Sequence, residues 1–350
     1  MSTEKRRRAA AALIRRGVAV IPVPAGEKNP GRPGWEALRI TEEEIPNYWT
    51  NGQNVGLLCG KPSGHRVDVD LDPDEAVKIA GRFLFPTLTS GRESRPHSHW
   101  WYVSPAAESC DWKDTDGSKL VELRCTGRQT LVPPSTHPDG DQYVWHAETG
   151  LKMAEVGAAE LTRRLRELAT AVLIACHLPP IRAGTEGGGR HDYALALAGF
   201  LLRPGRLGGD LTLKVLKGAW DAKGWPGEKE KREAHRDLEG IVSDTVENLI
   251  AGEPVVGGPT LEEYAPGMVR LLCKWWGWEQ KPKTEDEPEE KEERRNQADR
   301  LIGHALEGVQ ELFVDQHGAP HALIDGEPLP LTSRSYSWLR HLMWKRRDAP

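Results

Sequence analysis

Cysteine is scarce in this sequence and follows no pairing pattern. The five cysteines among 350 residues, Cys59, Cys110, Cys125, Cys176 and Cys273, are scattered and include no Cys-x-x-Cys pair. Zinc knuckles need closely spaced cysteines, and disulfide frameworks belong to short, cysteine-dense secreted chains. The cysteine pattern therefore argues against both classes.

Long hydrophobic runs are also missing. No segment approaches the roughly 20 apolar residues that a membrane span requires. Residues 1–8 are charged and lead into a short amphipathic stretch that lacks the apolar core of a signal peptide. We therefore expect a cytoplasmic protein with no membrane partner. The formal net charge of -5 does not indicate a polyanion-binding protein as a whole, although a basic groove can form on an acidic protein.

A phosphate-binding P-loop is absent as well. Gly60-Lys61 resembles the end of such a loop, but Pro62 follows it and no glycine lies five residues before Gly60. The sequence therefore contains no Walker-type nucleotide site.

A row of acidic residues is the most informative feature that is present. In Val67-Asp-Val-Asp-Leu-Asp-Pro73, strand alternation places Asp68, Asp70 and Asp72 on one face and the apolar residues on the other. Carboxylates this close raise one another's pKa unless a cation lies between them, and oxygen ligands favour Mg²⁺ or Mn²⁺. The alternative interpretation is a solvent-facing edge strand or turn that carries surface acids.

The chain changes character after about residue 150. Strands alternate with a few helices before that point, which predicts an α/β or α+β domain, and helical periodicity dominates after it. We expect a polar loop over residues 87–95. The other main elements are expected as strands over 18–23, 54–59, 96–103, 119–124 and 142–146, and helices over 4–16, 73–83, 192–203, 209–222, 229–250 and 260–276.

A second acid lies in an apolar strand. Glu122 is flanked by Val121 and Leu123, where an unpaired carboxylate would carry a desolvation penalty. A purely structural role for Glu122 therefore requires an arginine partner such as Arg124 or Arg128. Acids in two strands, together with cations and a histidine over residues 92–99, are the groups that metal-assisted phosphoryl transfer needs.

Five segments in order carry a family resemblance. Asn54-Val-Gly-Leu-Leu-Cys-Gly60, the acid row, Gly91-Arg-Glu-Ser-Arg-Pro-His-Ser-His99, Val121-Glu-Leu-Arg124 and Val132-Pro-Pro-Ser-Thr-His-Pro-Asp-Gly140 resemble the bifunctional DNA primase/polymerase domain of phages and plasmids. That domain belongs to the archaeo-eukaryotic primase superfamily, and the resemblance covers roughly residues 8–150. It implies an α/β (α+β) catalytic domain with an RRM-like mixed sheet that joins nucleoside triphosphates on a DNA template.

The resemblance implies a two-ion metal site. The ions, Mg²⁺ or Mn²⁺, would be held by an acid-x-acid pair together with Glu122. The pair is either Asp68 with Asp70 or Asp70 with Asp72, and Pro73 directly after the last acid favours the second choice. Asp68 would then support the site or act as an extra ligand. Asp70, Asp72, Glu122 and His99 are the expected catalytic residues.

The resemblance also implies a nucleotide site. Ser98 and His99 correspond to the family's Ser-x-His motif, whose histidine contacts the phosphates of the incoming nucleotide; otherwise His99 is a structural histidine. Further candidates lie in loops beside the motifs, where a cation binds either triphosphate or template backbone, or is simply solvated. They are Lys28, Arg92 and Arg95, with His137 near the sugar or base of the nucleotide.

The rest of the chain resembles the helical and linking regions of larger primase/polymerase helicases. We expect a catalytic domain over residues 1–150, a helical primase C-terminal-like domain over 151–280, a charged linker over 281–297 and a short α/β helicase lead-in over 298–350. Without a Walker motif, the chain is expected to be a fragment or to work with a separate helicase.

Three classes of function remain open at this point. The first is a template-dependent primase/polymerase whose partners are single-stranded DNA, a primer and dNTPs or NTPs. A metal-dependent nuclease or phosphodiesterase would use the same carboxylates with water as the nucleophile. A non-catalytic replication initiator would only hold single-stranded DNA.

Overall fold

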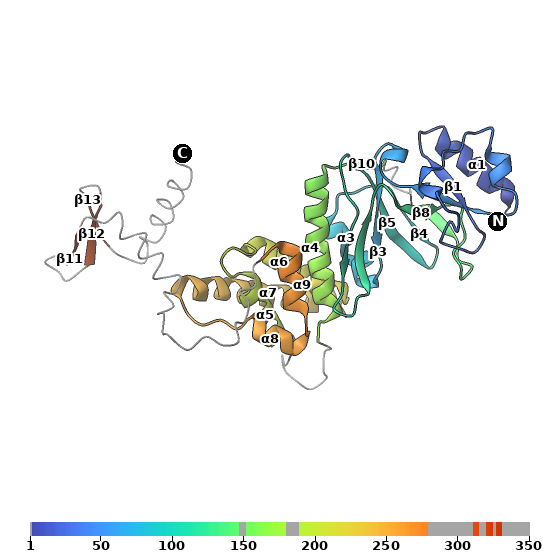
Figure 1. The fold of residues 1–350 in the computed structure, drawn as a ribbon. Helices are drawn as coiled ribbons and strands as arrows, with labels where there is room; N and C mark the ends of the chain where they lie inside the picture. Colours follow the sequence, from blue (N-terminus) through green and yellow to red (C-terminus); the bar gives the residue numbers. More distant parts are fainter. Residues whose placement is uncertain are drawn as a thin grey trace, which may run out of the picture. The chain divides into compact units, whose positions relative to one another are not determined.

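The computed structural model describes residues 2–146, 152–179 and 189–278, and the backbone of three strands between residues 311 and 330. The chain divides into two compact units, residues 1–245 with 256–281 and residues 246–255 with 282–350. Figure 1 shows the order of the elements along the chain. The predicted charged linker over residues 281–297 lies outside the described residues.

The N-terminal elements build a small sheet with a helix against it. Helix α1 (Thr3–Ile14) begins where the Ser2 side chain accepts a hydrogen bond from the backbone of Lys5, 3.3 Å away. Three antiparallel strands follow in the spatial order β1-β2-β8. They are β1 (Val20–Val23), β2 (Asn54–Leu58) and β8 (Gln129–Val132), with the short helix α2 (Ile45–Tyr48) between the first two along the chain.

A larger, seven-stranded sheet carries the acid row. Its order is β6-β7-β3-β5-β4-β9, with β10 paired to β5, and only the β10–β5 pairing is parallel. The strands are β3 (Arg66–Leu71), β4 (Thr89–Arg92), β5 (Arg95–Val103), β6 (Cys110–Lys113), β7 (Lys119–Arg124), β9 (Tyr143–His146) and β10 (Ala154–Glu155).

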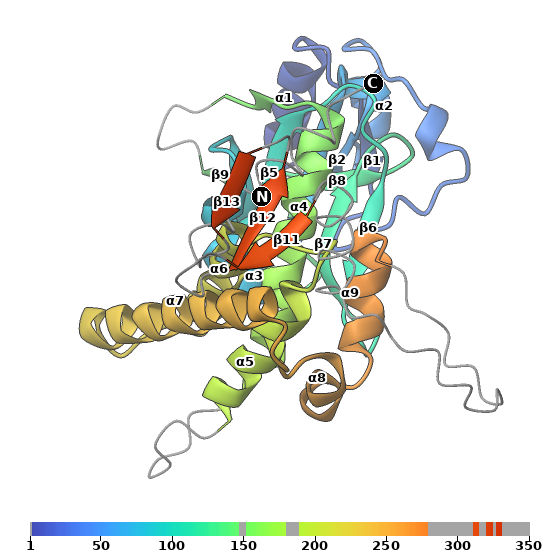
Figure 2. The same ribbon diagram turned by 90° about the vertical axis from the view of Figure 1, so that its left-hand side faces the viewer.

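The two faces of β3 have different partners. Val67, Val69 and Leu71 are buried in the core that helices α3 (Asp74–Phe83) and α4 (Ala158–Cys176) share with the sheet. Figure 2 shows α4 running across the sheet. Asp68 and Asp70 lie on the opposite face, as alternation predicts. Apolar packing against the helices therefore holds the carboxylates on the face that the helices do not cover.

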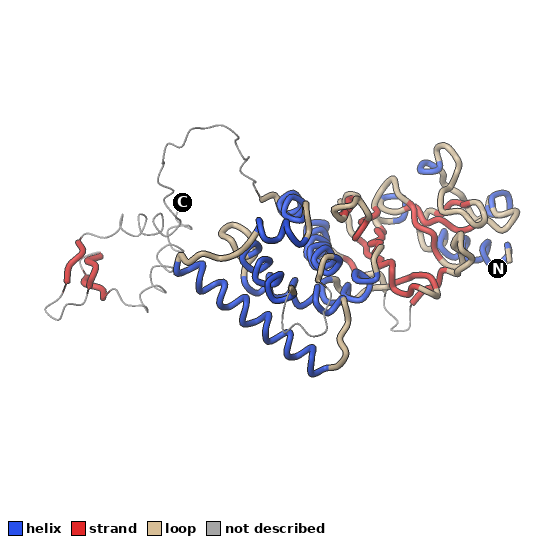
Figure 3. The backbone as a smooth tube through the Cα atoms, turned by 90° about the horizontal axis from the view of Figure 1, so that it is seen from below, coloured by secondary structure: helices blue, strands red, loops and turns tan. Residues whose placement is uncertain are grey.

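Helices make up the rest of the described first unit, as predicted. They are α5 (Arg190–Leu201), α6 (Gly209–Ala222), α7 (Glu228–Ala251), which continues into the second unit, α8 (Gly258–Tyr264) and α9 (Met268–Trp276). Figure 3 separates the strands of this unit, in red, from these helices, in blue. One core cluster joins residues of β3, β7 and the helices from α3 to α9.

Two local predictions are wrong. Residues 87–95 are not a polar loop, because β4 forms there between β5 and β9, where Thr89 and Ser90 are buried despite their polarity. The single helix predicted over 260–276 is two helices. Pro266 has no backbone N–H, and Gly267 has a φ of 88°, so the chain turns between α8 and α9.

The fold class is confirmed at the coarser level. A mixed α/β region with antiparallel sheets is followed by a helical region. The RRM-like topology and the domain boundaries stay predictions. In the second unit, β11 (Glu311–Val314), β12 (Pro320–Ile324) and β13 (Glu327–Pro330) form an antiparallel sheet within the predicted helicase lead-in. No described helix is both long and apolar enough to span a bilayer.

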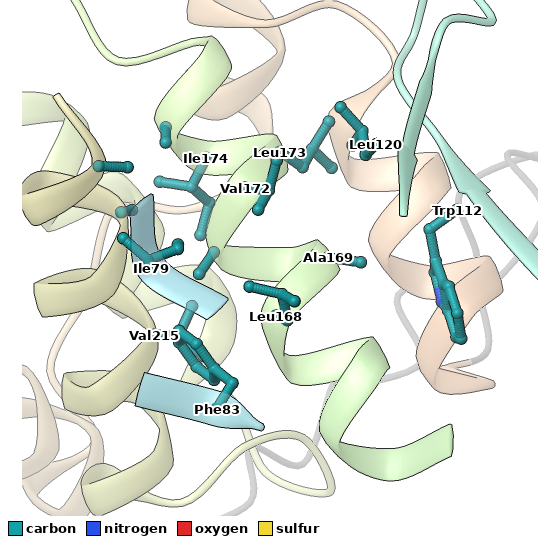
Figure 4. Packing of buried hydrophobic residues seen from close by; sticks show 14 of the residues in the cluster. Ile79, Phe83, Trp112, Leu120, Leu168, Ala169, Val172, Leu173, Ile174 and Val215 are labelled. Carbon is teal, nitrogen blue, oxygen red and sulfur yellow. The ribbon is translucent and has the colours of Figure 1, made fainter. Parts of the chain in front are cut away.

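Substitution of two glycines, Gly218 in α6 and Gly240 in α7, tests how closely α6 packs against Phe83 of α3. A Cβ at Gly218 in α6 would lie 2.9 Å from the ring of Phe83, which is fully buried beside Leu168 and Val215 (Figure 4). A Cβ at Gly240 in α7 meets nothing within 4 Å. We expect Gly218→Ala to lower the free energy of unfolding by about 1–2 kcal/mol, since overpacking exceeds the gain in helix propensity.

Gly240→Ala is the matched control, because the same substitution meets open space. It should leave the free energy of unfolding unchanged or raise it by up to about 1 kcal/mol. Urea unfolding followed by circular dichroism measures both variants. Equal stability of Gly218→Ala and the unaltered protein would contradict the close packing of α6 against Phe83.

Candidate active site

Strand register brings three of the predicted site residues together. Asp70 on β3 lies directly opposite His99 on β5 and directly opposite Glu122 on β7. Residues that face each other across antiparallel strands share a face, with Cβ atoms about 4.5–5.5 Å apart. The sheet therefore places two carboxylates and an imidazole from three adjacent strands around one point.

Asp68 lies behind this group rather than at its surface. The residue has no solvent-accessible surface and does not line the cavity described below. Its carboxylate accepts a hydrogen bond from the hydroxyl of Thr130 at 2.6 Å and lies 3.0 Å from Nδ1 of His99. Asp68 is therefore placed to orient His99, whose Nδ1 also lies 3.4 Å from Asp70.

Arg124 is the cation at the centre of the acid cluster, which consists of Asp68, Asp70 and Glu122. It lies two residues after Glu122 on β7 and opposite Asp68 on β3. One terminal nitrogen donates to both Asp70 and Glu122, at 3.0 Å for Glu122, and Nε donates to Glu122 at 3.0 Å. Lys119 donates to the same glutamate oxygen at 2.8 Å. Of the two arginine partners considered for Glu122, the structure selects Arg124.

The charges shift the titration of their neighbours. Burial alone would lower the pKa of His99, but the carboxylates of Asp68 and Asp70 outweigh it and raise this pKa. Burial alone would raise the pKa of Glu122, yet Arg124 and Lys119 together lower it. Partial burial of its carboxylate and the nearby Asp70 raise the pKa of Asp72 to about 6, although the residue as a whole is exposed.

A cavity of about 500 Å³ opens over the acid cluster. Its lining comes from the large sheet, from β8 of the small sheet and from the loop that follows β1. The acids are Asp70 and Glu122 of the large sheet and Asp72 directly after β3. Lys28 and Trp35 come from the loop after β1, Arg128 from the turn before β8, and Thr130 from β8. The cavity therefore joins carboxylates on one wall to cations and an aromatic ring on another.

Most of the predicted nucleotide-binding residues line this cavity. Lys28, Arg92, Arg95, Ser98 and His99 are all on its wall. The Arg95 side chain donates to the backbone carbonyl of Asp72, which anchors it beside the end of β3.

His137 does not line the cavity. Its Nδ1 lies 3.4 Å from the guanidinium of Arg92 and 2.5 Å from Asp139, which pairs with Arg92 at 2.8 Å. The structure therefore places His137 next to a cavity residue and one step away from the cavity itself.

The match of Ser98 and His99 to a Ser-x-His motif needs correction. The two residues are consecutive, so the spacing lacks the intervening position. The residue two positions before His99 is His97, which adopts a left-handed backbone with a φ of 56°. An expectation that Ser98 contacts the nucleotide therefore depends on its place in the cavity wall and not on the motif.

The donor chemistry of the cavity suits a hard divalent ion. Asp70, Asp72 and Glu122 offer carboxylate oxygens, which Mg²⁺ and Mn²⁺ prefer. Within the described ranges, however, no three His, Cys, Asp or Glu side chains converge in a metal-binding arrangement. Arg124 and Lys119 already hold the oxygens of Asp70 and Glu122. The carboxylates therefore suit the ions chemically, and ion binding requires that Arg124 and Lys119 release the oxygens of Asp70 and Glu122.

Three residues of the site, Arg124, Lys119 and Thr130, make contacts that the sequence analysis does not predict. Arg124 was considered only as a partner for Glu122, although its i+2 spacing on one strand already places it on the same face. Lys119 lies three residues before Glu122 and was not singled out. Thr130 reaches Asp68 from a strand of the other sheet, 62 residues away along the chain. No local pattern signals such a contact.

A comparison with known families assigns this region. Residues 10–160 match the family model described as bifunctional DNA primase/polymerase, N-terminal, and the match includes the acid cluster and His99. This region belongs to the prim-pol family. Prim-pol enzymes are DNA primases and polymerases, a class of nucleotidyltransferase that generally uses divalent metals and acts on a DNA template with nucleotides. No curated protein and no solved structure matches the chain in the corresponding searches.

The contact between Asp68 and His99 in the prim-pol domain can be tested through the pKa of His99. The pKa of His99 should lie above the ordinary value of 6.5, since Asp68 and Asp70 stabilise the imidazolium. Replacing Asp68 by asparagine removes one of these charges and should lower the pKa of His99. Titration by ¹H–¹⁵N NMR, with the signal assigned by its loss in His99→Gln, measures the pKa.

Asp139→Asn is the control, because Asp139 contacts His137 rather than His99. It should leave the pKa of His99 in place. A pKa of His99 that does not fall in Asp68→Asn would contradict the pairing.

Proposed function

We propose that the chain is a template-dependent DNA primase/polymerase that joins nucleoside triphosphates by two-metal nucleotidyl transfer during phage or plasmid replication. The observation that carries the proposal is the cavity whose lining includes Asp70 and Glu122 together with Lys28, Arg92 and Arg95. Metal-assisted transfer of a nucleotide requires carboxylates for the ions and cations for the triphosphate. Both sets line the same cavity within the prim-pol match.

Each residue has a distinct task in this proposal. Asp70, Asp72 and Glu122 would hold the ions, which supply activation of the attacking hydroxyl and neutralise charge on the leaving pyrophosphate when bound. Asp68 does not reach the cavity and would act by orienting His99. Because Nδ1 of His99 is engaged by Asp68, Nε2 is the nitrogen left to donate to a phosphate oxygen. The raised pKa of His99 favours the imidazolium form, in which both ring nitrogens donate.

The remaining parts of the proposal concern the chain as a whole. We infer an RRM-like catalytic domain over residues 1–150, a helical region over 151–280 that assists priming, a charged linker over 281–297 and a helicase lead-in over 298–350. A helicase in the same protein or in a partner would then open the duplex. A hydrogen bond between His177, just after α4, and Asp114, just after β6, links the helical region to the predicted catalytic domain. An ion pair between Lys223, just after α6, and Glu75 on α3 makes a second link, and both support a joint role.

Primer extension tests the reaction. Asp70→Asn keeps the size of the side chain but removes a charge from the proposed metal site. We expect incorporation of labelled nucleotides with Mn²⁺ to fall below about one hundredth of the unaltered rate, because the ions supply several kcal/mol of transition-state stabilisation. Asp116→Asn, in the turn before β7, is the control and should retain activity.

The same assay separates the other classes of function. With single-stranded template, with and without primer, a polymerase makes new strands, a nuclease degrades the template, and a binding protein leaves it unchanged. Undiminished synthesis by Asp70→Asn would refute the assignment of the metal site.

His99→Ala tests the nucleotide contact. Loss of a charge-assisted hydrogen bond to a phosphate should raise the KM for the nucleotide roughly 10- to 100-fold. The affinity for template should stay the same, since the template is not expected to touch His99. Steady-state kinetics and fluorescence anisotropy with labelled template measure the two effects. An unchanged KM with weakened template binding would show that His99 serves the template instead.

A further inference from the structure

Arg124 occupies the position between the two carboxylates that a bridging metal ion would need. The same terminal nitrogen of its guanidinium donates to Asp70 on β3 and to Glu122 on β7. Asp70 and Glu122 face each other across the two strands, so a cation between them contacts both. With Arg124 there, the described residues show no three-ligand metal cluster. The protein thus supplies its own cation at this point.

The charges around these two carboxylates are already matched. Asp70 and Glu122 carry two negative charges, and Arg124 and Lys119 carry two positive ones. Asp68, 3.7 Å from Arg124, is paired in addition with His99 at 3.0 Å. A bare divalent ion that enters must compete with an arginine that donates two hydrogen bonds to one oxygen of Glu122 and one to Asp70, and such charge-assisted hydrogen bonds are strong. A nucleoside triphosphate carries about four negative charges, so it reaches the site with divalent ions as a nearly neutral complex and offers acceptors to a displaced guanidinium.

One contact of Arg124 involves neither Asp70 nor Glu122. Its other terminal nitrogen donates to the Thr130 hydroxyl at 3.2 Å, and its side chain is 21 % exposed and lines the cavity. The guanidinium can therefore leave the carboxylates and remain in the cavity wall, within reach of a ligand that fills the cavity. Arg128, an exposed cation in the same wall, makes no ion pair with any described residue.

We propose that Arg124 is the resident counter-cation of Asp70 and Glu122 and releases them to divalent ions only when a nucleoside triphosphate enters with those ions. Metal and nucleotide then bind cooperatively. The proposal rests on the proposed function and names the residue that couples the two ligands. Arg124 acts here as a positioning residue, because it determines whether the carboxylates are available.

Binding of Mn²⁺ tests the proposal without any turnover. Electron paramagnetic resonance measures free Mn²⁺ in the presence of the full chain, alone and with a nucleotide whose α,β-bridge is an imido group that blocks transfer. Samples of nucleotide without protein correct for the Mn²⁺ that the nucleotide holds itself. The unaltered protein should bind Mn²⁺ weakly without the nucleotide. With the nucleotide, its affinity for Mn²⁺ should be higher by a factor of roughly ten or more.

Arg124→Gln should remove this dependence. Its affinity for Mn²⁺ without nucleotide should rise roughly tenfold or more, since the carboxylates lose their competing charge. Arg128→Gln makes the same change in net charge in the same cavity but frees no carboxylate, so it should behave as the unaltered protein does. Arg124→Lys keeps the charge but replaces three nitrogens, which together donate to Asp70, Glu122 and Thr130, by a single ammonium, and its affinity should lie between the two.

Three outcomes would overturn the proposal in distinguishable ways. Equal Mn²⁺ affinity of Arg124→Gln and the unaltered protein without nucleotide would show that Arg124 does not compete with the ion. If Arg124→Gln fails to fold, the unaltered protein still decides, because equal Mn²⁺ binding with and without nucleotide refutes cooperative loading. Absence of Mn²⁺ binding in every sample would refute the proposed two-metal function itself, and this inference with it.

Discussion

Burial of like charges is the constraint on which this structure depends. Asp68, Asp70 and Glu122 are buried on one face of a sheet, where unpaired carboxylates would be costly. The sheet meets this cost with partners at fixed positions: Arg124 bridges two of the acids, and His99 and Thr130 take the third. These contacts exist only when β3, β5 and β7 pair in one register. A shift of β3 by one residue would turn Asp68 and Asp70 toward the helices.

The apolar face of the same strand secures that register. Val67, Val69 and Leu71 have at most 1 % of their surface exposed, in the core formed with α3 and α4. A slipped strand would have to bury aspartates among leucines and valines, so the hydrophobic core and the acid cluster enforce the same pairing. Stability and chemistry are therefore coupled through one strand. The alternation of seven residues encodes both.

This coupling explains why much of the site was predictable from the sequence. Alternation in residues 67–72 placed Asp68 and Asp70 on one face, and Glu122 stood out because an acid in an apolar strand needs a partner. Other parts carried no local signal. Thr130 and Trp35 reach the cavity from the small sheet and its loop, and β4 forms from residues of polar composition because two neighbouring strands pair with it. The break between α8 and α9 did have a local signal in Pro266 and Gly267. The prediction of a single helix followed the apolar periodicity and disregarded these two residues.

The hairpin before His99 shows how backbone shape replaces motif spacing. The pairing of β4 with β5 shifts between Ser90 and Arg92, and a Cβ at Gly91 would lie 2.4 Å from the carbonyl oxygen of Arg95. Close approach of the two strands at this bulge requires the glycine. His97 takes up the irregularity with its left-handed backbone, after which His99 returns to register opposite Asp70. The imidazole therefore reaches the acid cluster even though the residues before it depart from the family's spacing.

Acidic and basic side chains line different parts of the cavity. Asp70 and Glu122 lie on β3 and β7, where Arg124 and Lys119 partner them, while Arg92 and Arg95 lie on β4 and at the start of β5, and Lys28 lies in the loop after β1. In a partly dehydrated cavity such charges interact more strongly than in water, so a ligand with separated positive and negative parts is favoured over a simple anion or cation. A phosphate chain that carries its own divalent ions has this separation. In the free protein, Arg124 and Lys119 neutralise the buried carboxylates. The same arrangement therefore favours a metal-bound triphosphate, whose ions can take the place of these cations.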